Sequence, residues 1–218
     1  MKKNLLFFAL AVGLLASAPT LQAQVNISRY ITLTVKRGEA IQLAFTAAVA
    51  GTPVRIVSGS NTYDIIAGNT WLKRNPYTAG STTMTIYGDI TYFVCRENRA
   101  NLIAIDVSHN TQLTHLDCAT NKLTVLDVSD NTKLTKLWCS SNMLTSLDVS
   151  HNTKLKLLYC YDNNFSTATL DDIYCALPDR TGNTNGVIVP VKNSSSSNNA
   201  TVIATNRANA TAKLEGTI

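Results

Sequence analysis

Apolar residues recur at a fixed short period through the middle of the chain. From Leu102 onward a leading apolar residue follows at alternating intervals of 11 and 10, at Leu102, Leu113, Leu123, Leu134, Leu144, Leu155 and Phe165. A second apolar residue lies three positions after each of the first six. The third, two positions further on, alternates between valine and cysteine. One complete repeat is therefore 21 residues long and consists of two similar halves.

Each half ends in asparagine, and an earlier half from Ile90 to Asn98 extends the series toward the N-terminus. The asparagines are Asn98, Asn110, Asn121, Asn131, Asn142, Asn152 and Asn163, and the cysteines are Cys95, Cys118, Cys139 and Cys160. Alternating apolar residues predict short strands with one face turned inward. Stacked coils would pair these strands in parallel and bury a column that a single coil leaves exposed, so both ends of the stack require caps.

The asparagines and cysteines are best interpreted as structural residues. An inward asparagine side chain can satisfy backbone groups that a bend leaves without partners. The repeating cysteines are expected to be small core residues. Neighbouring coils about 4.8 Å apart would bring their Cα atoms within disulfide range, but parallel side chains give poor bridge geometry. We therefore expect thiols.

The segments on either side of the repeats predict the two caps. Residues 24–89 contain alternating stretches at 31–35, 41–45, 54–57 and 83–87 separated by glycine-containing turns, which indicates a small β-domain covering the first coil. Residues 166–218 form the C-terminal cap and tail, with a strand at 187–191, a polar loop at 193–199 and a weakly patterned end at 200–218.

A capping helix is predicted directly after the last coil. Ser166 is its expected N-cap, Pro178 ends it, and Asp171 and Asp172 are expected near its positive end. The apolar stripe comprises Leu170, Ile173, Tyr174 and Leu177. Cys175 lies away from this stripe, so we expect it to be the accessible cysteine.

The patterns LxxLxCxxN and LxxLDVSxN resemble the leucine-rich repeat, in particular the short bacterial subclass with 21-residue nested repeats found in internalin-like secreted and surface proteins. The resemblance covers residues 90–165. It implies a β-rich leucine-rich-repeat solenoid of about 3.5 coils with parallel strands. Such proteins use variable residues on the outer strand surface to bind proteins or cell-surface glycans.

The N-terminus predicts export. Lys2 and Lys3 precede an apolar run from Leu5 to Ala18, and the run leads to the segment Leu21-Gln22-Ala23, which is typical of a secretory signal peptide over residues 1–23. We expect a secreted or cell-surface protein, with the periplasm as a further possible compartment, and no membrane insertion after cleavage. The formal charge of +5 falls to +3 without Lys2 and Lys3, which gives no reason to expect a nucleic-acid partner.

Candidate catalytic chemistry is sparse. The chain has three histidines, and no CxxC, HExxH, phosphate-binding loop or GxSxG motif. His115 lies three residues before Cys118, but the histidine is expected to face outward and the cysteine inward. We therefore expect neither an enzyme nor a cofactor.

One outward column consists of acidic residues in the valine-type halves, namely Asp106, Asp127 and Asp148. Stacked carboxylates repel, which would raise their pKa values. Two interpretations remain open: a cation such as calcium bridges them, or each accepts hydrogen bonds from nearby hydroxyl or backbone groups such as the following serine, Thr124 or Thr145. We favour the second.

The outward positions of the cysteine-type halves supply the candidate ligand-binding residues, namely Tyr92, His115, Lys136, Trp138, Tyr159 and Tyr161. Trp138 and Tyr159 are expected to stack in register, and such aromatic residues are enriched at binding hot spots. The leading hypothesis is a recognition module for a protein or a glycan. The alternatives are a structural spacer without its own ligand and, third, an enzyme. The sequence does not predict the oligomeric state.

Overall fold

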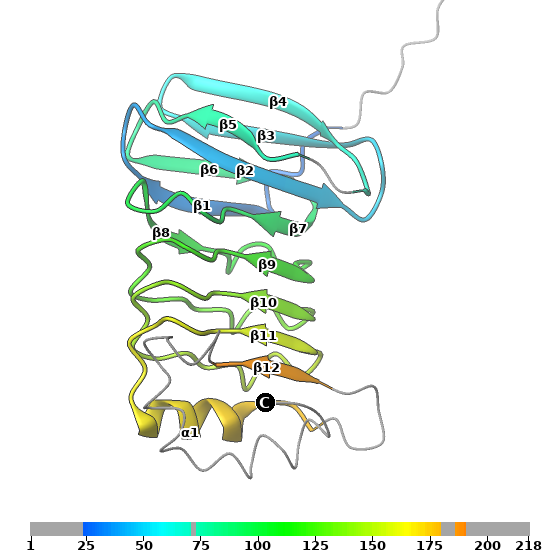
Figure 1. Ribbon diagram of the computed structural model, residues 1–218. Helices are drawn as coiled ribbons and strands as arrows, with labels where there is room; N and C mark the ends of the chain where they lie inside the picture. The colour runs from blue at the N-terminus through cyan, green and yellow to red at the C-terminus, as the bar shows by residue number, and fades with distance from the viewer. Residues whose placement is uncertain (1–23, 71–72, 180–185, 191–218) are drawn as a thin grey trace, which may run out of the picture.

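A column of stacked coils continues directly from a two-sheet β-structure, as the ribbon diagram shows (Figure 1). The computed structural model describes residues 24–70, 73–179 and 186–190. The predicted signal peptide (1–23), the polar loop (193–199) and the C-terminal tail (200–218) lie outside the described residues.

The first sheet contains five strands and is antiparallel throughout. Its order is β4 (Asn61–Ala67), β3 (Thr52–Ser58), β6 (Thr83–Tyr87), β1 (Tyr30–Val35) and β8 (Leu102–Asp106). The predicted stretches 31–35, 54–57 and 83–87 correspond to β1, β3 and β6. Strand β4 was not predicted, because its sequence NTYDIIA lies at the sheet edge, where it is buried only at its last residue.

The second sheet runs the length of the molecule. Its order is β12 (Val187–Val189), β11 (Leu157–Tyr159), β10 (Lys136–Trp138), β9 (His115–Asp117), β7 (Ile90–Val94), β2 (Ala40–Ala47) and β5 (Asn75–Thr78). Pairing is parallel from β7 to β12 and antiparallel where β2 meets β7 and β5. The predicted stretch 41–45 corresponds to β2, and β5 was not predicted.

The predicted leucine-rich-repeat solenoid is confirmed. The middle residues of the parallel strands lie in register and are buried, namely Phe93, Leu116, Leu137, Leu158 and Ile188. The four repeat cysteines are buried thiols, as expected. Among the described repeats, every cysteine-type half forms a strand, whereas of the valine-type halves only the first does so, as β8.

The strands that precede the repeats, β1 to β6, cap the solenoid by continuing its hydrogen bonding; their parts of the two sheets are called the N-terminal sheets below. Strand β2 pairs with β7, and β1 pairs with β8. The Asn98 side chain accepts a hydrogen bond from the Gln42 backbone N–H at 2.7 Å and donates to the Gln42 carbonyl at 3.0 Å. The first coil therefore meets a strand that takes the place of a preceding coil, and one apolar cluster extends from Ile31 to Ile188.

The C-terminal cap is α1 (Thr167–Ala176) followed by β12. The Ser166 hydroxyl accepts a hydrogen bond from the Thr169 N–H, which confirms the predicted N-cap, and the predicted apolar stripe is buried. The placement of Asp171 and Asp172 beside the helix N-terminus was wrong, because the helix begins at Thr167 and its first turn contains no acidic residue. Cys175 is exposed, as expected. Within the described residues, no helix has the length and apolarity needed to cross a bilayer.

Buried asparagine side chains bond backbone groups at the bends, as predicted, and they also join successive coils. The Asn142 amide nitrogen donates to the carbonyls of Cys139 in its own coil and Cys118 in the previous coil, at 3.0 and 3.1 Å. Its oxygen accepts a hydrogen bond from the Leu123 N–H at 3.1 Å. Asn110 belongs to the first valine-type half, so no earlier valine-type half precedes it. Neither the nitrogen nor the oxygen of its buried side-chain amide has a hydrogen-bond partner among the described residues.

The contrast between these two asparagines predicts different mutational costs. Asn142→Ala removes bonds from both coils and leaves the Leu123 N–H buried without a partner, so we expect it to lower the free energy of unfolding by about 3 kcal/mol. Asn110→Ala removes an amide with no side-chain bonds to lose and should cost less than about 1 kcal/mol. Urea denaturation of both variants measures the difference. Equal losses of stability would contradict the proposal that the stacked asparagine side chains, the asparagine ladder, stabilise the protein by joining successive coils.

The residue before each asparagine in the cysteine-type halves has a left-handed backbone. The φ angles are 62° at Glu97, 57° at Thr120, 54° at Ser141 and 53° at Asp162. This conformation is especially unfavourable for a β-branched residue such as threonine.

Thr120→Asn should therefore stabilise the protein. Asparagine tolerates the left-handed region, and the backbone hydrogen bonds of residue 120 do not depend on its side chain. We expect the free energy of unfolding to rise by about 0.5–1 kcal/mol. Ser141→Asn is the matched control for a residue without β-branching and should gain less. A loss of stability in Thr120→Asn would show that its hydroxyl contributes more than the backbone strain costs.

Candidate functional site

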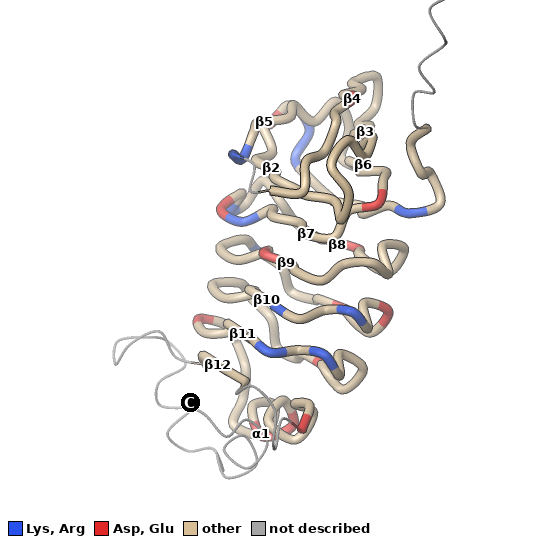
Figure 2. Tube along the Cα trace, turned by 90° about the vertical axis from the view of Figure 1, so that its right-hand side faces the viewer, with Lys and Arg blue, Asp and Glu red and all other residues tan. Residues whose placement is uncertain are grey.

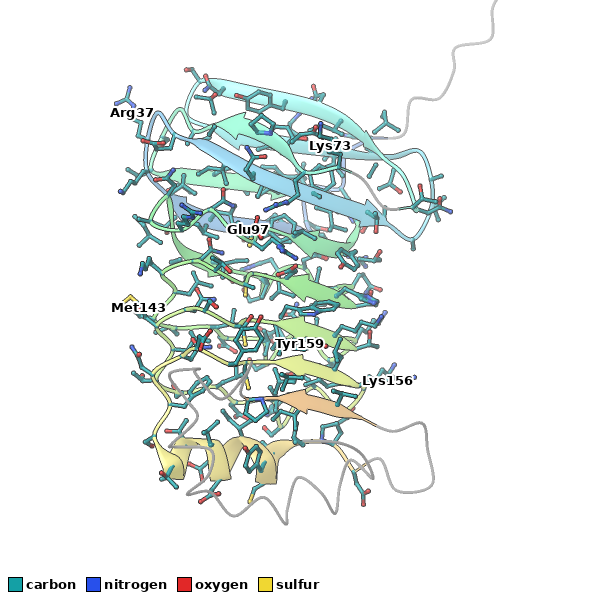
Figure 3. The ribbon with its side chains drawn as sticks, viewed as in Figure 1. Arg37, Lys73, Glu97, Met143, Lys156 and Tyr159 are labelled. Carbon is teal, nitrogen blue, oxygen red and sulfur yellow. The ribbon has the colours of Figure 1, made fainter. Side chains whose placement is uncertain are left out.

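A pocket of about 440 Å³ lies on the outer face of the second sheet, where the first coils meet the N-terminal sheets. Strands β2, β7, β9 and β10 form its floor, in which Thr46 of β2 is the register partner of Tyr92, and the segment after β4 forms one wall. The lining residues are Thr46, Asn69, Thr70, Tyr92, Arg96, His115, Asp117, Lys136 and Trp138. Figure 3 shows this side of the molecule, with Glu97 and Tyr159 labelled on it.

Parallel pairing arranges the outward side chains in two columns. Tyr92, His115 and Lys136 are register partners and form one column. The second column comprises Val94, Asp117, Trp138 and Tyr159. Because strand neighbours lie about 4.8 Å apart, side chains within a column are in contact range.

Three rings form a compact aromatic cluster in the pocket. The Tyr92 and His115 ring centroids are 4.9 Å apart, and the Trp138 centroid is 6.5 Å from each of them. Tyr92 and Trp138 belong to strands two positions apart, a separation of about 9.6 Å in the sheet. The indole therefore leans across the row of β9 toward Tyr92, past the position of Asp117.

Asp117 is a buried carboxylate at the base of this cluster. It is 7% exposed, and its Oδ1 accepts a hydrogen bond from the Ala119 N–H at 3.2 Å. Its Oδ2 lies 3.6 Å from the Arg96 Nη1, too far for a good hydrogen bond. Burial raises the pKa of Asp117 and outweighs the lowering effects of that hydrogen bond and of Arg96. Burial, together with the charge of Asp117, also raises the pKa of Tyr92 to about 12.

Arg96 is held in place from outside the pocket. Its Nε and Nη2 both donate to Glu97 Oε1, at 3.1 and 2.7 Å. Arg74 donates to the other oxygen, Oε2, at 2.6 Å. These two guanidinium groups lower the pKa of Glu97 to about 2. The carboxylate therefore remains ionised at neutral pH and fixes the Arg96 guanidinium at the pocket edge.

His115 presents a hydrogen-bond acceptor to the pocket. The Thr114 hydroxyl donates to the Thr91 carbonyl at 2.8 Å and lies 2.9 Å from His115 Nδ1. When the hydroxyl donates its one hydrogen to the Thr91 carbonyl, Nδ1 is the donor in the second bond and Nε2 of the neutral ring is an acceptor. Burial and Lys136 lower the pKa of His115, which favours the neutral ring. Cys118 is fully buried, away from this outer face.

Among the predicted ligand-binding residues, Tyr92, His115, Lys136 and Trp138 line the pocket together. Tyr159 stacks on Trp138 at 6.3 Å with nearly parallel planes, as expected, and Tyr161 meets Tyr159 edge-on at 6.4 Å. These two tyrosines extend the aromatic surface beyond the pocket.

Sequence reasoning missed Asp117, Arg96, Thr46, Asn69 and Thr70 as site residues. The signal for Asp117 was an acidic residue in an outward column that otherwise contains Val94, Trp138 and Tyr159. No signal in the sequence identified the other four residues. Thr46, for example, reaches the pocket only through the long-range antiparallel pairing of β2 with β7.

The aspartate column Asp106, Asp127 and Asp148 is hydrogen-bonded. Each Oδ1 accepts from the backbone N–H of the serine two residues later, at 2.8–2.9 Å. The expectation that mutual repulsion raises their pKa values was wrong: the pKa is lowered at all three, because the serine hydrogen bonds outweigh burial and, at Asp106 and Asp127, the charge of the next aspartate. Within the described ranges, no group of three or more His, Cys, Asp or Glu side chains is arranged to hold a metal ion.

Basic and acidic residues are interspersed along the stack, as the charge-coloured trace shows (Figure 2).

Comparison with known proteins gives partial similarities. No protein-family model and no curated protein matches the chain. The functional domain of InlJ from Listeria monocytogenes, described as including a cysteine ladder, is 38% identical over 38% of this chain and 19% of that chain, with a TM-score of 0.34. The internalin InlF from L. monocytogenes strain 4b F2365 is 26% identical over 38% of this chain and 26% of that chain, with a TM-score of 0.33. The chain thus spans well under a third of either structure.

The raised pKa of Asp117 predicts a pH-dependent cost to stability. Its folded-state pKa exceeds the unfolded value of about 4, so the unfolded chain gives up this proton more readily. The resulting destabilisation is absent below the unfolded pKa and reaches its full size above the folded pKa. Asp117→Asn should therefore be more stable than the unmodified protein at pH 7, and the gain should vanish as the pH falls toward 3.

Thermal melting between pH 3 and pH 7 measures this difference. Asp127→Asn is the matched control, and its folded-state pKa is shifted the opposite way. It should be unchanged or slightly less stable at pH 7. A melting temperature that falls in Asp117→Asn at pH 7 would contradict the dominance of burial over the contact with Arg96.

Proposed function

We propose that this leucine-rich-repeat protein is an exported recognition module that binds a cell-surface partner, a protein or a glycan, through the outer face of its stacked strands. The observation that carries the proposal is the aromatic surface formed by Tyr92, His115, Trp138, Tyr159 and Tyr161. These side chains are only partly buried. Tyrosine and tryptophan in such positions are the residues that most often contribute binding energy at interfaces.

The surroundings support binding more than catalysis. Among the described residues, the pocket lining contains no serine or cysteine nucleophile beside His115, and Asp117 contacts Arg96 and Ala119. A buried carboxylate with a raised pKa costs stability, which is a common sign of a functional site. Export rests on the basic and apolar segments at the N-terminus. We place the protein at the cell surface or in the surrounding medium.

A paired substitution tests the proposal. The chain lacking residues 1–23 is immobilised and incubated with bacterial and host-cell surface extracts. Trp138→Ala combined with Tyr159→Ala should weaken retention of the bound material at least about tenfold, because each residue is positioned as a hot spot. His151→Ala, an exposed ring in a valine-type half, is the control and should change nothing. Unchanged retention by the double variant would overturn the proposal and leave a spacer role.

A further inference from the structure

The pocket beside the N-terminal sheets has the size of a small-ligand site. Its volume of about 440 Å³ lies within the range of about 300–1,000 Å³ that is usual for such sites. The exposed residues Asn69 and Thr70 add a wall to a strand face that is otherwise open. A ligand lying along the aromatic surface would therefore end against this wall.

The aromatic cluster lines the pocket with three partly buried rings. Tyr92 and His115 are stacked with an interplanar angle of 24°, and Trp138 makes the same angle with His115. The face of an aromatic ring is electron-rich and attracts the weakly positive C–H groups of a flat, partly apolar molecule. Such a ligand needs at least one face that carries hydrogens instead of hydroxyl groups.

The spacing of Asp117 and Arg96 beside the cluster leaves room for a ligand hydroxyl that bonds both groups. Asp117 Oδ2 and Arg96 Nη1 lie 3.6 Å apart, beyond good hydrogen-bond distance. A hydroxyl between them can donate to the carboxylate and accept from the guanidinium at once. Glu97 holds the other side of Arg96, so this pair of groups is already in position. His115 Nε2 adds an acceptor for a second hydroxyl.

The pocket lining carries both signs of charge, so an ionic ligand of either sign meets at least one like charge. An anionic group would meet the buried Asp117 carboxylate, and a cationic group would meet Arg96 and Lys136. Desolvating a charge against a like charge is costly. A neutral molecule that combines several hydroxyl groups with one apolar face satisfies both the rings and the polar groups, and pyranose sugars have this chemistry.

We propose that the pocket binds a neutral hexopyranose unit, with an apolar sugar face on Tyr92, His115 and Trp138 and a hydroxyl group bridging Asp117 and Arg96. This assignment rests on the proposed recognition function and narrows its partner to a glycan. Asp117 and Arg96 determine which hydroxyl groups are accepted, and the wall formed by Asn69 and Thr70 favours the end of a glycan chain.

Direct titration tests the sugar assignment. The chain lacking residues 1–23 is examined by saturation-transfer NMR with the methyl glycosides of glucose, galactose, mannose and N-acetylglucosamine, and with methyl sialoside as the acidic arm. At least one neutral glycoside should bind. Asp117→Asn and Trp138→Ala should each weaken that binding at least tenfold, while Trp138→Phe should restore most of it by keeping an aromatic face. Asp127→Asn, the same change outside the pocket, should bind as the unmodified protein does.

Several outcomes would overturn the sugar assignment: no glycoside binds, only the sialoside binds, or the neutral glycosides bind Asp117→Asn and Trp138→Ala unchanged. Thermal melting of each variant separates loss of binding from loss of folding. Extracts oxidised with periodate, which cleaves vicinal diols and leaves the polypeptide chain intact, distinguish this proposal from the broader one. Retention of untreated extract alone supports a glycan. Equal retention of both extracts overturns the glycan and preserves recognition, and retention of neither overturns both.

Discussion

In-register parallel pairing of the short strands is the constraint on which the rest of the molecule depends. Each strand of the stack is only three to five residues long and contributes one fully buried middle residue to a shared column. A strand this short has little stability alone, so the sheet exists because each coil has a neighbour on both sides. Strand β2 supplies the neighbour at one end, and β12 with α1 at the other.

The same pairing creates the outer surface. Side chains that lie 21 or 23 residues apart in the sequence become neighbours across the sheet, so residue types at one repeat position form a column. At the inward positions this produces buried thiols and an asparagine ladder. At the outward positions it produces an aromatic surface with one buried carboxylate inside it. Burial raises the pKa of Asp117, whereas the hydrogen bonds from Ser129 lower the pKa of Asp127, although both are outward aspartates on the same solenoid.

The repeat made most of the solenoid predictable from sequence. The inward leucines, the buried cysteines, the asparagine ladder and the Ser166 cap each follow from local spacing, and the stacking of Trp138 on Tyr159 follows from the period. The failures involve contacts that no period encodes. Strands β4 and β5 pair through long-range antiparallel registers, and the pocket wall comes from the N-terminal sheets. The aspartate pKa values were misjudged because a hydrogen bond from the serine two residues later outweighs repulsion between successive coils.

The position of the pocket separates it from the part of the protein that can change in length. Its floor uses β2, β7, β9 and β10 and its wall uses the segment after β4, whereas β11, β12 and the helix lie beyond it. Because each coil contacts its immediate neighbours, 21-residue units can be gained or lost below β10 without altering the geometry of the pocket. Evolution could thus lengthen or shorten the aromatic platform beside a fixed site, and related chains could share one specificity while differing in reach.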